Sequence, residues 1–391
     1  MRKIFLLLVI IIVLLTLVVS CKPADAQAKI DELEAKIAEL EKAQAEQKPE
    51  GEEESPTTEA LEEKPEKEFS PTIAGSLYIS GQTAAVYVIG DCAYAAGQGL
   101  KIIDITDKNN PTIVSTADAT GWALDFYVEG NYAYLPYTSW DNEGYPSGGG
   151  FKIIDITDKK KPTEVGIFES DGEIGDIGIL ENYIYASYEV LEEQDEGYYN
   201  IVESGIKIID MTGKENPVSV GIYDTGESGR SPVCIEGDYA YIFVGQTLKI
   251  LDITDRENPT DIGSYISSGG WVRDLCVVGD YAYLPSSNSL QIIDISDKEN
   301  PIMAGGAFAP GGISYGFVEG DYAYITYVVT DANWQVKESG MQIIDVKDKN
   351  APTVVTGVEI PGEAAGIFVE GDYAYVGAGP VGLHILKLYA D

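Results

Sequence analysis

The sequence has too little histidine, cysteine and positive charge for several classes of function. The one His in 391 residues excludes a multi-histidine metal site, and a histidine-based catalytic triad would have to use His384. Four cysteines are too few for a disulfide scaffold in a chain of this length. Lys+Arg 26 against Asp+Glu 64 gives a net charge of −38, which argues against nucleic acid or an anionic lipid surface as partner. No P-loop, Gly-x-Ser-x-Gly, Cys-x-x-Cys or Asp-x-Asp-x-Asp-Gly motif occurs.

Residues 1–20 have the pattern of a secretory signal peptide. Two basic residues precede an apolar run, Ile4 to Val19, that would span roughly 24 Å as a helix. That is short of the roughly 30 Å needed to cross a membrane. The run ends Val18-Val19-Ser20-Cys21, which resembles the lipobox of bacterial lipoproteins, and the resemblance implies that Cys21 is lipidated. The alternative is an uncleaved signal anchor. Both place the rest of the chain outside the cytoplasm, anchored to a membrane at the cell surface or facing a periplasm.

Residues 21–69 are predicted to form a stalk. Ile30, Leu33, Ile37 and Leu40 follow the 3-4-3 spacing of a coiled coil, but for only two heptads. This helix either dimerises weakly or stays single and solvated. Lys48 to Glu68 holds Glu, Pro, Lys and Thr with almost nothing to bury, so we expect an extended linker there.

Residues 70–391 consist of seven repeats of a Gly-Asp-Tyr-Ala-Tyr unit, an Ile-Ile-Asp-Ile-Thr-Asp run and an Asn-Pro-Thr run. The units begin at Gly90, Gly130, Glu181, Gly237, Gly279, Gly320 and Gly371, with small substitutions in the first three. Each period contains four strand-like runs separated by hairpin signals, which is the pattern of a β-propeller blade. The seventh repeat lacks its Pro-Thr run, and Ser70-Pro71-Thr72-Ile73 supplies one at the other end. We therefore predict an all-β, seven-bladed propeller in which residues 70–81 pair with 364–391 and close the ring.

The whole repeat resembles the LVIVD-repeat family of extracytoplasmic propellers. The resemblance covers residues 70–391 and implies a location at the cell surface or in the periplasm, with no assigned catalytic residues. Positions that recur in every blade are assigned to folding: the Ile-Ile-Asp aspartates as turn acceptors, and the slot of Lys207, Gln291 and His384 as an outward strand position. We expect alanine at Lys207 or Gln291 to have no effect.

Features that the repeat does not require are the better candidates for function. Blades 2, 3 and 6 carry insertions between their second and third runs, all on one face of a propeller. The candidate ligand-binding aromatics there are Trp140, Tyr145, Tyr198, Tyr199 and Trp334. Exposed aromatics among carboxylates and amides suit sugar stacking or protein recognition. The alternative is that the loops pack on each other as a lid.

The blade-to-blade connectors reach the same face and add further candidates. Trp122 and Trp271 fill equivalent positions, and Arg230 and Arg273 are two of four arginines in the chain. Asp125, Asp176 and Asp274 share a slot five residues before the repeat's glycine or its equivalent, so we expect them to meet near the mouth of the channel. Three carboxylates there could hold Ca²⁺ or form acid/base pairs. The alternative is structural pairing with arginine and water.

The leading hypothesis is a membrane-anchored propeller that binds an extracellular or periplasmic protein or glycan. No cofactor is expected unless the three aspartates hold Ca²⁺. The alternative is a calcium-dependent glycan-cleaving enzyme that uses those carboxylates. Binding is favoured because no histidine lies near the channel and no nucleophile motif is present.

Overall fold

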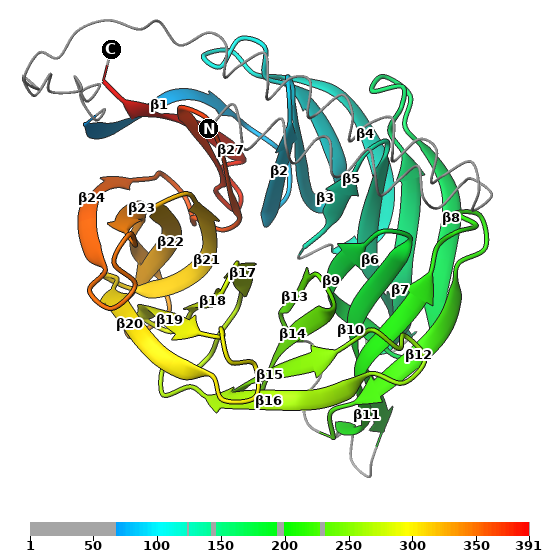
Figure 1. The fold of residues 1–391 in the computed structure, drawn as a ribbon. Coiled ribbons are helices and arrows are strands. Elements are labelled where there is room, and N and C mark those ends of the chain that lie inside the picture. Colours follow the sequence, from blue (N-terminus) through cyan, green and yellow to red (C-terminus); the bar gives the residue numbers. More distant parts are fainter. Residues whose placement is uncertain (1–67, 123–124, 142–145, 194–198, 227–230, 391) are drawn as a thin grey trace, which may run out of the picture. The chain divides into compact units, whose positions relative to one another are not determined.

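A computed structural model describes residues 68–122, 125–141, 146–193, 199–226 and 231–390. The chain divides into residues 1–65 and 66–391, and every described residue belongs to the second unit. That unit is all-β and contains seven antiparallel sheets arranged in a ring (Figure 1), as the repeats predict. The signal peptide, Cys21 and the stalk lie outside the described residues. Within the described part, no helix is long and apolar enough to cross a membrane.

Blade 4 shows the common topology: β13 (Val233–Glu236), β14 (Tyr239–Val244), β15 (Thr247–Asp252) and β16 (Thr260–Ile266) lie side by side in chain order. The first strand faces the centre of the ring and the last lies at the rim (Figure 1). Blades 2, 3, 5 and 6 also contain four strands that are consecutive in the chain. Blade 2 contains β5 (Tyr127–Glu129), β6 (Tyr132–Trp140), β7 (Pro146–Asp155) and β8 (Thr163–Ser170), and blade 3 contains β9 (Glu173–Leu180), β10 (Tyr183–Glu193), β11 (Tyr199–Asp210) and β12 (Val218–Asp224). Blade 5 contains β17 (Cys276–Val278), β18 (Tyr281–Pro285), β19 (Ser289–Asp294) and β20 (Ile302–Phe308), and blade 6 contains β21 (Gly312–Glu319), β22 (Tyr322–Thr330), β23 (Val336–Asp345) and β24 (Thr353–Glu359).

Each of blades 2 to 6 has two turns on the same face: the first joins its first and second strands, and the second joins its third and fourth strands. The Gly-Asp turn needs a left-handed residue, and Gly237 has φ 59°. In the second turn Asp252 Oδ1 accepts a hydrogen bond from the Thr254 amide at 2.8 Å. The aspartates that recur at this position in other blades accept the same bond, so their predicted role as turn acceptors is confirmed.

Blade 1 departs from the expected four separate strands. Its sheet contains β2 (Ala85–Ile89), β3 (Cys92–Asp104) and β4 (Thr112–Trp122). A straight strand as long as β3 would place its ends about 40 Å apart. The Ile105 amide nevertheless donates to the Asp91 carbonyl at 3.0 Å, so β3 reverses at its glycines and contains both middle runs of the repeat.

The predicted closure of the ring is confirmed. Blade 7 contains β25 (Ile367–Glu370), β26 (Tyr373–Gly377) and β27 (Leu383–Tyr389), and its rim strand is β1 (Phe69–Leu77) from the start of the propeller. The register runs from Phe69 opposite Tyr389 to Leu77 opposite Leu383. β27 is thereby paired on both sides, with β26 and with β1.

Neighbouring blades are joined by a contact that repeats around the ring. A turn of one blade places a cation over a tyrosine of the preceding blade, as Lys159 does over Tyr94 with 5.1 Å from nitrogen to ring centroid. The other pairs are Lys108 over Tyr375, Lys214 over Tyr134, Arg256 over Tyr183, Lys298 over Tyr239 and Lys349 over Tyr281. The same turns bring a backbone carbonyl against a rim-strand glycine. A Cβ at Gly263 would lie 1.9 Å from the Lys298 carbonyl oxygen, so only glycine fits.

Candidate functional site

One face of the propeller carries all the long hairpins. Because the strands of a blade alternate in direction, the hairpin between its second and third strands emerges on the same face as the connector to the next blade. We call this the loop face and the opposite one the turn face. In blade 3 the second and third strands pair as far as Glu193 and Tyr199, and in blade 6 as far as Thr330 and Val336. The predicted insertions of blades 2, 3 and 6 therefore extend existing sheets rather than form separate loops.

Three of the four tryptophans are exposed on the loop face. Trp140 ends β6 and is 57% exposed, and Trp271, in the connector from blade 4 to blade 5, is 85% exposed. Trp334, at the tip of the blade 6 hairpin, is 84% exposed. Its left-handed backbone, with φ 61°, is held by a turn in which Asp331 Oδ1 accepts the Asn333 and Gln335 amides at 2.8 and 3.0 Å. A large apolar side chain is thus fixed pointing into solvent.

The structure describes the remaining predicted ligand-binding residues only in part. Trp122 ends β4 opposite Gln98, and nothing further is described of its side chain. Tyr199 is half-buried in β11, and Arg273 is exposed. Tyr145, Tyr198 and Arg230 lie outside the described residues.

The three aspartates of the shared slot meet at the centre of the ring, as predicted. Each accepts a hydrogen bond at Oδ1 from the next residue's amide: Phe126 to Asp125 at 2.7 Å, Ile177 to Asp176 at 2.8 Å and Leu275 to Asp274 at 2.8 Å. The second oxygen of Asp176 accepts from Val233 of blade 4 at 2.7 Å, and that of Asp274 accepts from Gly316 of blade 6 at 2.8 Å. The carboxyl of Asp125 lies close enough to that of Asp176 for the two groups to affect each other's pKa. The aspartates therefore join the innermost strands of successive blades.

Burial raises the pKa of all three carboxyls, and for Asp125 and Asp176 neighbouring negative charge raises it further. Burial first, and then the charge of Asp274, raise the pKa of Asp125 from 3.8 to about 7. Burial followed by the charge of Asp125 raises the pKa of Asp176, and burial raises that of Asp274. Backbone amides already occupy both carboxyl oxygens of Asp176 and of Asp274, which leaves these oxygens less available to a calcium ion. Among the described residues, no group of three His, Cys, Asp or Glu side chains could hold a metal ion.

The sequence analysis missed a fourth member of this cluster, Tyr315. Tyr315 lies five residues before Gly320 and therefore occupies the aspartate slot of blade 6. Burial, followed by the charges of Asp125, Asp274 and Asp176, raises the pKa of its hydroxyl. Counting back from each glycine, without restricting the search to acidic residues, would have found it.

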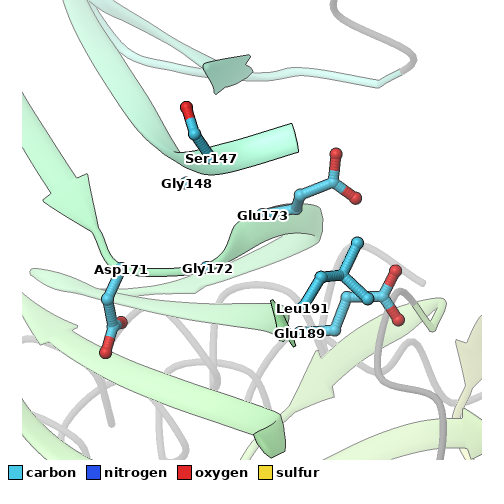
Figure 2. A pocket seen from close by; sticks show the side chains of 7 residues that line it. All are labelled: Ser147, Gly148, Asp171, Gly172, Glu173, Glu189 and Leu191. Carbon is cyan, nitrogen blue, oxygen red and sulfur yellow. The ribbon is translucent and has the colours of Figure 1, made fainter. Parts of the chain in front are cut away.

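A small cavity of about 80 Å³ lies on the loop side between blades 2 and 3 (Figure 2). Its lining residues are Ser147, Gly148, Asp171, Gly172, Glu173, Glu189 and Leu191. The carboxylates of Glu173 and Glu189 project to the same side as Leu191, whereas Asp171 points the other way (Figure 2). The volume is that of a few water molecules, far below that of a ligand pocket. The sequence analysis did not single out either glutamate.

The outward position predicted for Lys207 and Gln291 is wrong, because both side chains are buried. Lys207 is 7% exposed, forms an ion pair with Asp171 and lies over the Tyr188 ring with 4.2 Å from nitrogen to centroid. Gln291 is 4% exposed, and Ser267 Oγ donates to its Oε1 at 3.1 Å. Their slot faces the neighbouring blade's connector instead of solvent. Alternation along a strand identifies the face on which a side chain lies, but not what covers that face.

His384 occupies the same slot and is also buried, at 4% exposed. Its Nε2 donates to the Pro361 carbonyl at 3.0 Å, so its Nδ1 accepts from Ser76 Oγ at 2.7 Å. These contacts join β27 to β1. The single histidine of the chain therefore has a structural role in ring closure.

Comparison with known proteins agrees with this architecture. The LVIVD repeat family matches residues 80–119, 120–170, 231–267, 269–307 and 361–386. The chain is an LVIVD-repeat β-propeller. The matched stretches of this LVIVD propeller omit most of blades 3 and 6, two of the three blades with long hairpins.

Solved structures share the fold of the LVIVD propeller at low sequence identity. The computationally designed Ika8 protein is 10% identical with a TM-score of 0.54, and covers 81% of this chain and 99% of its own. A chain of the Mitotic Checkpoint Complex is 8% identical with a TM-score of 0.58, and covers 87% of this chain and 100% of its own. These similarities concern the fold alone. No curated protein matches the sequence.

Proposed function

We propose that this LVIVD propeller is a membrane-anchored, extracytoplasmic module that binds a protein or a glycan through its loop face. One observation carries the proposal. The five exposed large aromatic side chains of the described residues all belong to the loop face: Tyr78, Trp140, Trp271, Phe308 and Trp334. Large exposed aromatics are unusual on a surface in contact only with water, and they anchor protein and sugar ligands.

The anchoring part of the proposal rests on the sequence of residues 1–21 and on where the propeller begins. Phe69 stacks on Tyr389 and packs edge-on against Tyr322, which follows the Gly-Asp turn of blade 6. The chain therefore enters β1 on the turn face. The residues before Glu68 are therefore joined to the propeller at its turn face, the face opposite the loop face.

Binding can be tested with the full-length chain in a non-ionic detergent. We expect it to bind members of a glycan array or defined envelope proteins, and expect Trp140→Ala and Trp334→Ala to weaken that binding at least tenfold. Lys160→Ala is the matched control, because Lys160 is exposed on a turn of blade 2 on the opposite face. Equal binding by all variants would exclude the loop face.

The same preparation tests the catalytic alternative. A glycan panel is incubated with the chain, with and without a calcium chelator. The hydrogen bonds that already occupy the aspartate oxygens support binding without turnover. Chelator-sensitive cleavage that Asp125→Asn abolishes would show that the enzyme hypothesis is correct.

A further inference from the structure

The loop face of blade 5 carries an apolar patch that the repeat does not require. We define the blade 5 patch as Ile266, Trp271 and Phe308, which are 74%, 85% and 77% exposed. Ile266 is the last residue of β16, Trp271 lies in the connector that follows, and Phe308 ends β20. All three are thus on the loop side of adjoining elements.

Contacts with one short hairpin bring these residues to the same place. The tip of the β18–β19 hairpin is Ser286–Ser289, and Phe308 pairs with Ser289 across the sheet. A Cβ on Gly270, the residue before Trp271, would lie 2.7 Å from Ser287 Oγ. Trp271 and Phe308 therefore flank this tip.

Ile266 is held near the β18–β19 hairpin by the contacts of Ser267, the residue that follows it. Ser267 bonds to Gln291 of β19, and its amide donates to the Gln246 carbonyl at 2.8 Å. The hairpins of blades 4 and 5 are short, whereas those of blades 3 and 6 extend further along their strands. The patch thus lies in the part of the loop face where the hairpins are short.

The charge of this sector is the opposite of what the composition predicts. The chain has Asp+Glu 64 against Lys+Arg 26. Nevertheless the segments that form the sector, residues 262–273, 281–293 and 302–318, contain no acidic residue, and Asp274, which directly follows Arg273, is hydrogen-bonded to backbone amides of the central cluster. Their one charged residue is Arg273, which is exposed and forms no ion pair with a carboxylate of the described residues.

We propose that the blade 5 patch docks a protein segment in which a carboxylate lies next to a large apolar side chain. The proposal deepens the proposed function and rests on it. Elsewhere the acidic surface repels such a segment and attracts any basic one, so specificity arises where the acidic residues are missing. Arg273 offers the planar fork that binds a carboxylate with two hydrogen bonds, and Trp271 and Phe308 offer rigid apolar contact area.

Synthetic peptides provide the probe. Three sets of equal length are used: aspartate with phenylalanine, lysine with phenylalanine, and aspartate with serine. Their binding to the full-length chain is measured by fluorescence anisotropy in non-ionic detergent. We expect the aspartate–phenylalanine set to bind at least tenfold more tightly than the other two, and added salt to weaken its binding.

Variants of the chain locate the site. Arg273→Glu, Trp271→Ala and Phe308→Ser are each expected to weaken binding at least tenfold, and Arg273→Lys to have an intermediate effect. Ile302→Ala is the matched control, because it removes an exposed apolar side chain at the opposite, turn-face end of β20, the strand that Phe308 ends. Thermal melting of every variant confirms that it folds.

Several results would overturn the proposal. Tighter binding of the lysine–phenylalanine set would show that the charge assignment is wrong. Sensitivity to Trp334→Ala but not to Trp271→Ala would move the site to another part of the loop face and leave the proposed function standing. Sedimentation as a dimer that Phe308→Glu dissociates would identify a second copy as the occupant. If no peptide binds, but the wild-type chain binds a glycan and Trp140→Ala does not, the peptide proposal would be refuted and the proposed function would stand.

Discussion

At the scale of single residues, the half-buried aspartates at the centre make stability depend on pH. The pKa of Asp125 is raised from 3.8 to about 7, so the folded protein holds this proton more tightly than the unfolded chain. The stabilisation is complete below about pH 4 and is lost as the pH rises through 7. A shift of about 3 pKa units corresponds to at most about 4 kcal/mol.

We therefore predict that Asp125→Asn raises the melting temperature at pH 8 and leaves it nearly unchanged at pH 4. Asparagine keeps an acceptor for the Phe126 amide but carries no charge. Thermal unfolding of both proteins from pH 4 to pH 8 checks the prediction.

Asp104→Asn is the control of opposite sign. The Thr106 hydroxyl and amide lower the pKa of Asp104, so its stabilisation is present above pH 3.8 and is lost in acid. This variant is expected to be less stable at neutral pH. Equal pH profiles for wild type and Asp125→Asn would contradict the raised pKa of Asp125.

The same residues show what the sequence could reveal of the site. A common distance from the repeat glycine was enough to predict that Asp125, Asp176 and Asp274 meet. The repeat pattern could not show that backbone amides of the next blade donate hydrogen bonds to the aspartate oxygens, because those bonds depend on how neighbouring blades pack. Lys207 was misjudged for the same reason: its ion-pair partner Asp171 lies in a connector that no repeat position describes.

At the scale of elements, closure depends on one strand that is far from its partners in sequence. The missing Pro-Thr run of the last repeat was enough to predict the pairing of β1 with β27. The sequence analysis did not predict that two runs of the repeat merge into β3, or that the insertions lengthen paired strands. Both depend on the local hydrogen-bond pairing between strands, which the repeat pattern does not encode.

We predict that deleting residues 70–81 lowers the melting temperature and causes self-association. The deletion removes the rim strand of blade 7, takes Ser76 from buried His384 and exposes the edge of β27. Differential scanning fluorimetry and size-exclusion chromatography measure the two effects. Removal of residues 48–67, which precede the described part, is the control and is expected to melt like the full chain. A deletion variant that melts like wild type would refute the closure.

At the scale of the whole molecule, the prediction is covalent attachment to lipid. Ser20 before Cys21 and the preceding apolar run motivate it, and both lie outside the described residues. Cys21→Ala is expected to accumulate unprocessed precursor and to lose labelling by a fatty-acid analogue in cells. Cys92→Ala, which changes a cysteine of the propeller, serves as the control. Labelling that persists in Cys21→Ala would refute lipidation at Cys21, whereas a wild-type chain that is neither cleaved nor labelled would favour an uncleaved signal anchor.

The cation-over-tyrosine contacts have a mechanical consequence. Six of the seven blades receive such a cap from the turn of their successor, and in blade 6 Phe69 lies over Tyr322 and Tyr324 instead, with centroids 4.7 and 6.4 Å apart. Phe69 is also the first residue of β1. A pull on the chain ahead of Glu68 would therefore load this aromatic cap first and then the ladder of β1 along β27. Under tension the ring would open between β1 and β27. The other six caps are formed by turns within blades 1 to 6, so the pull would not act on them directly.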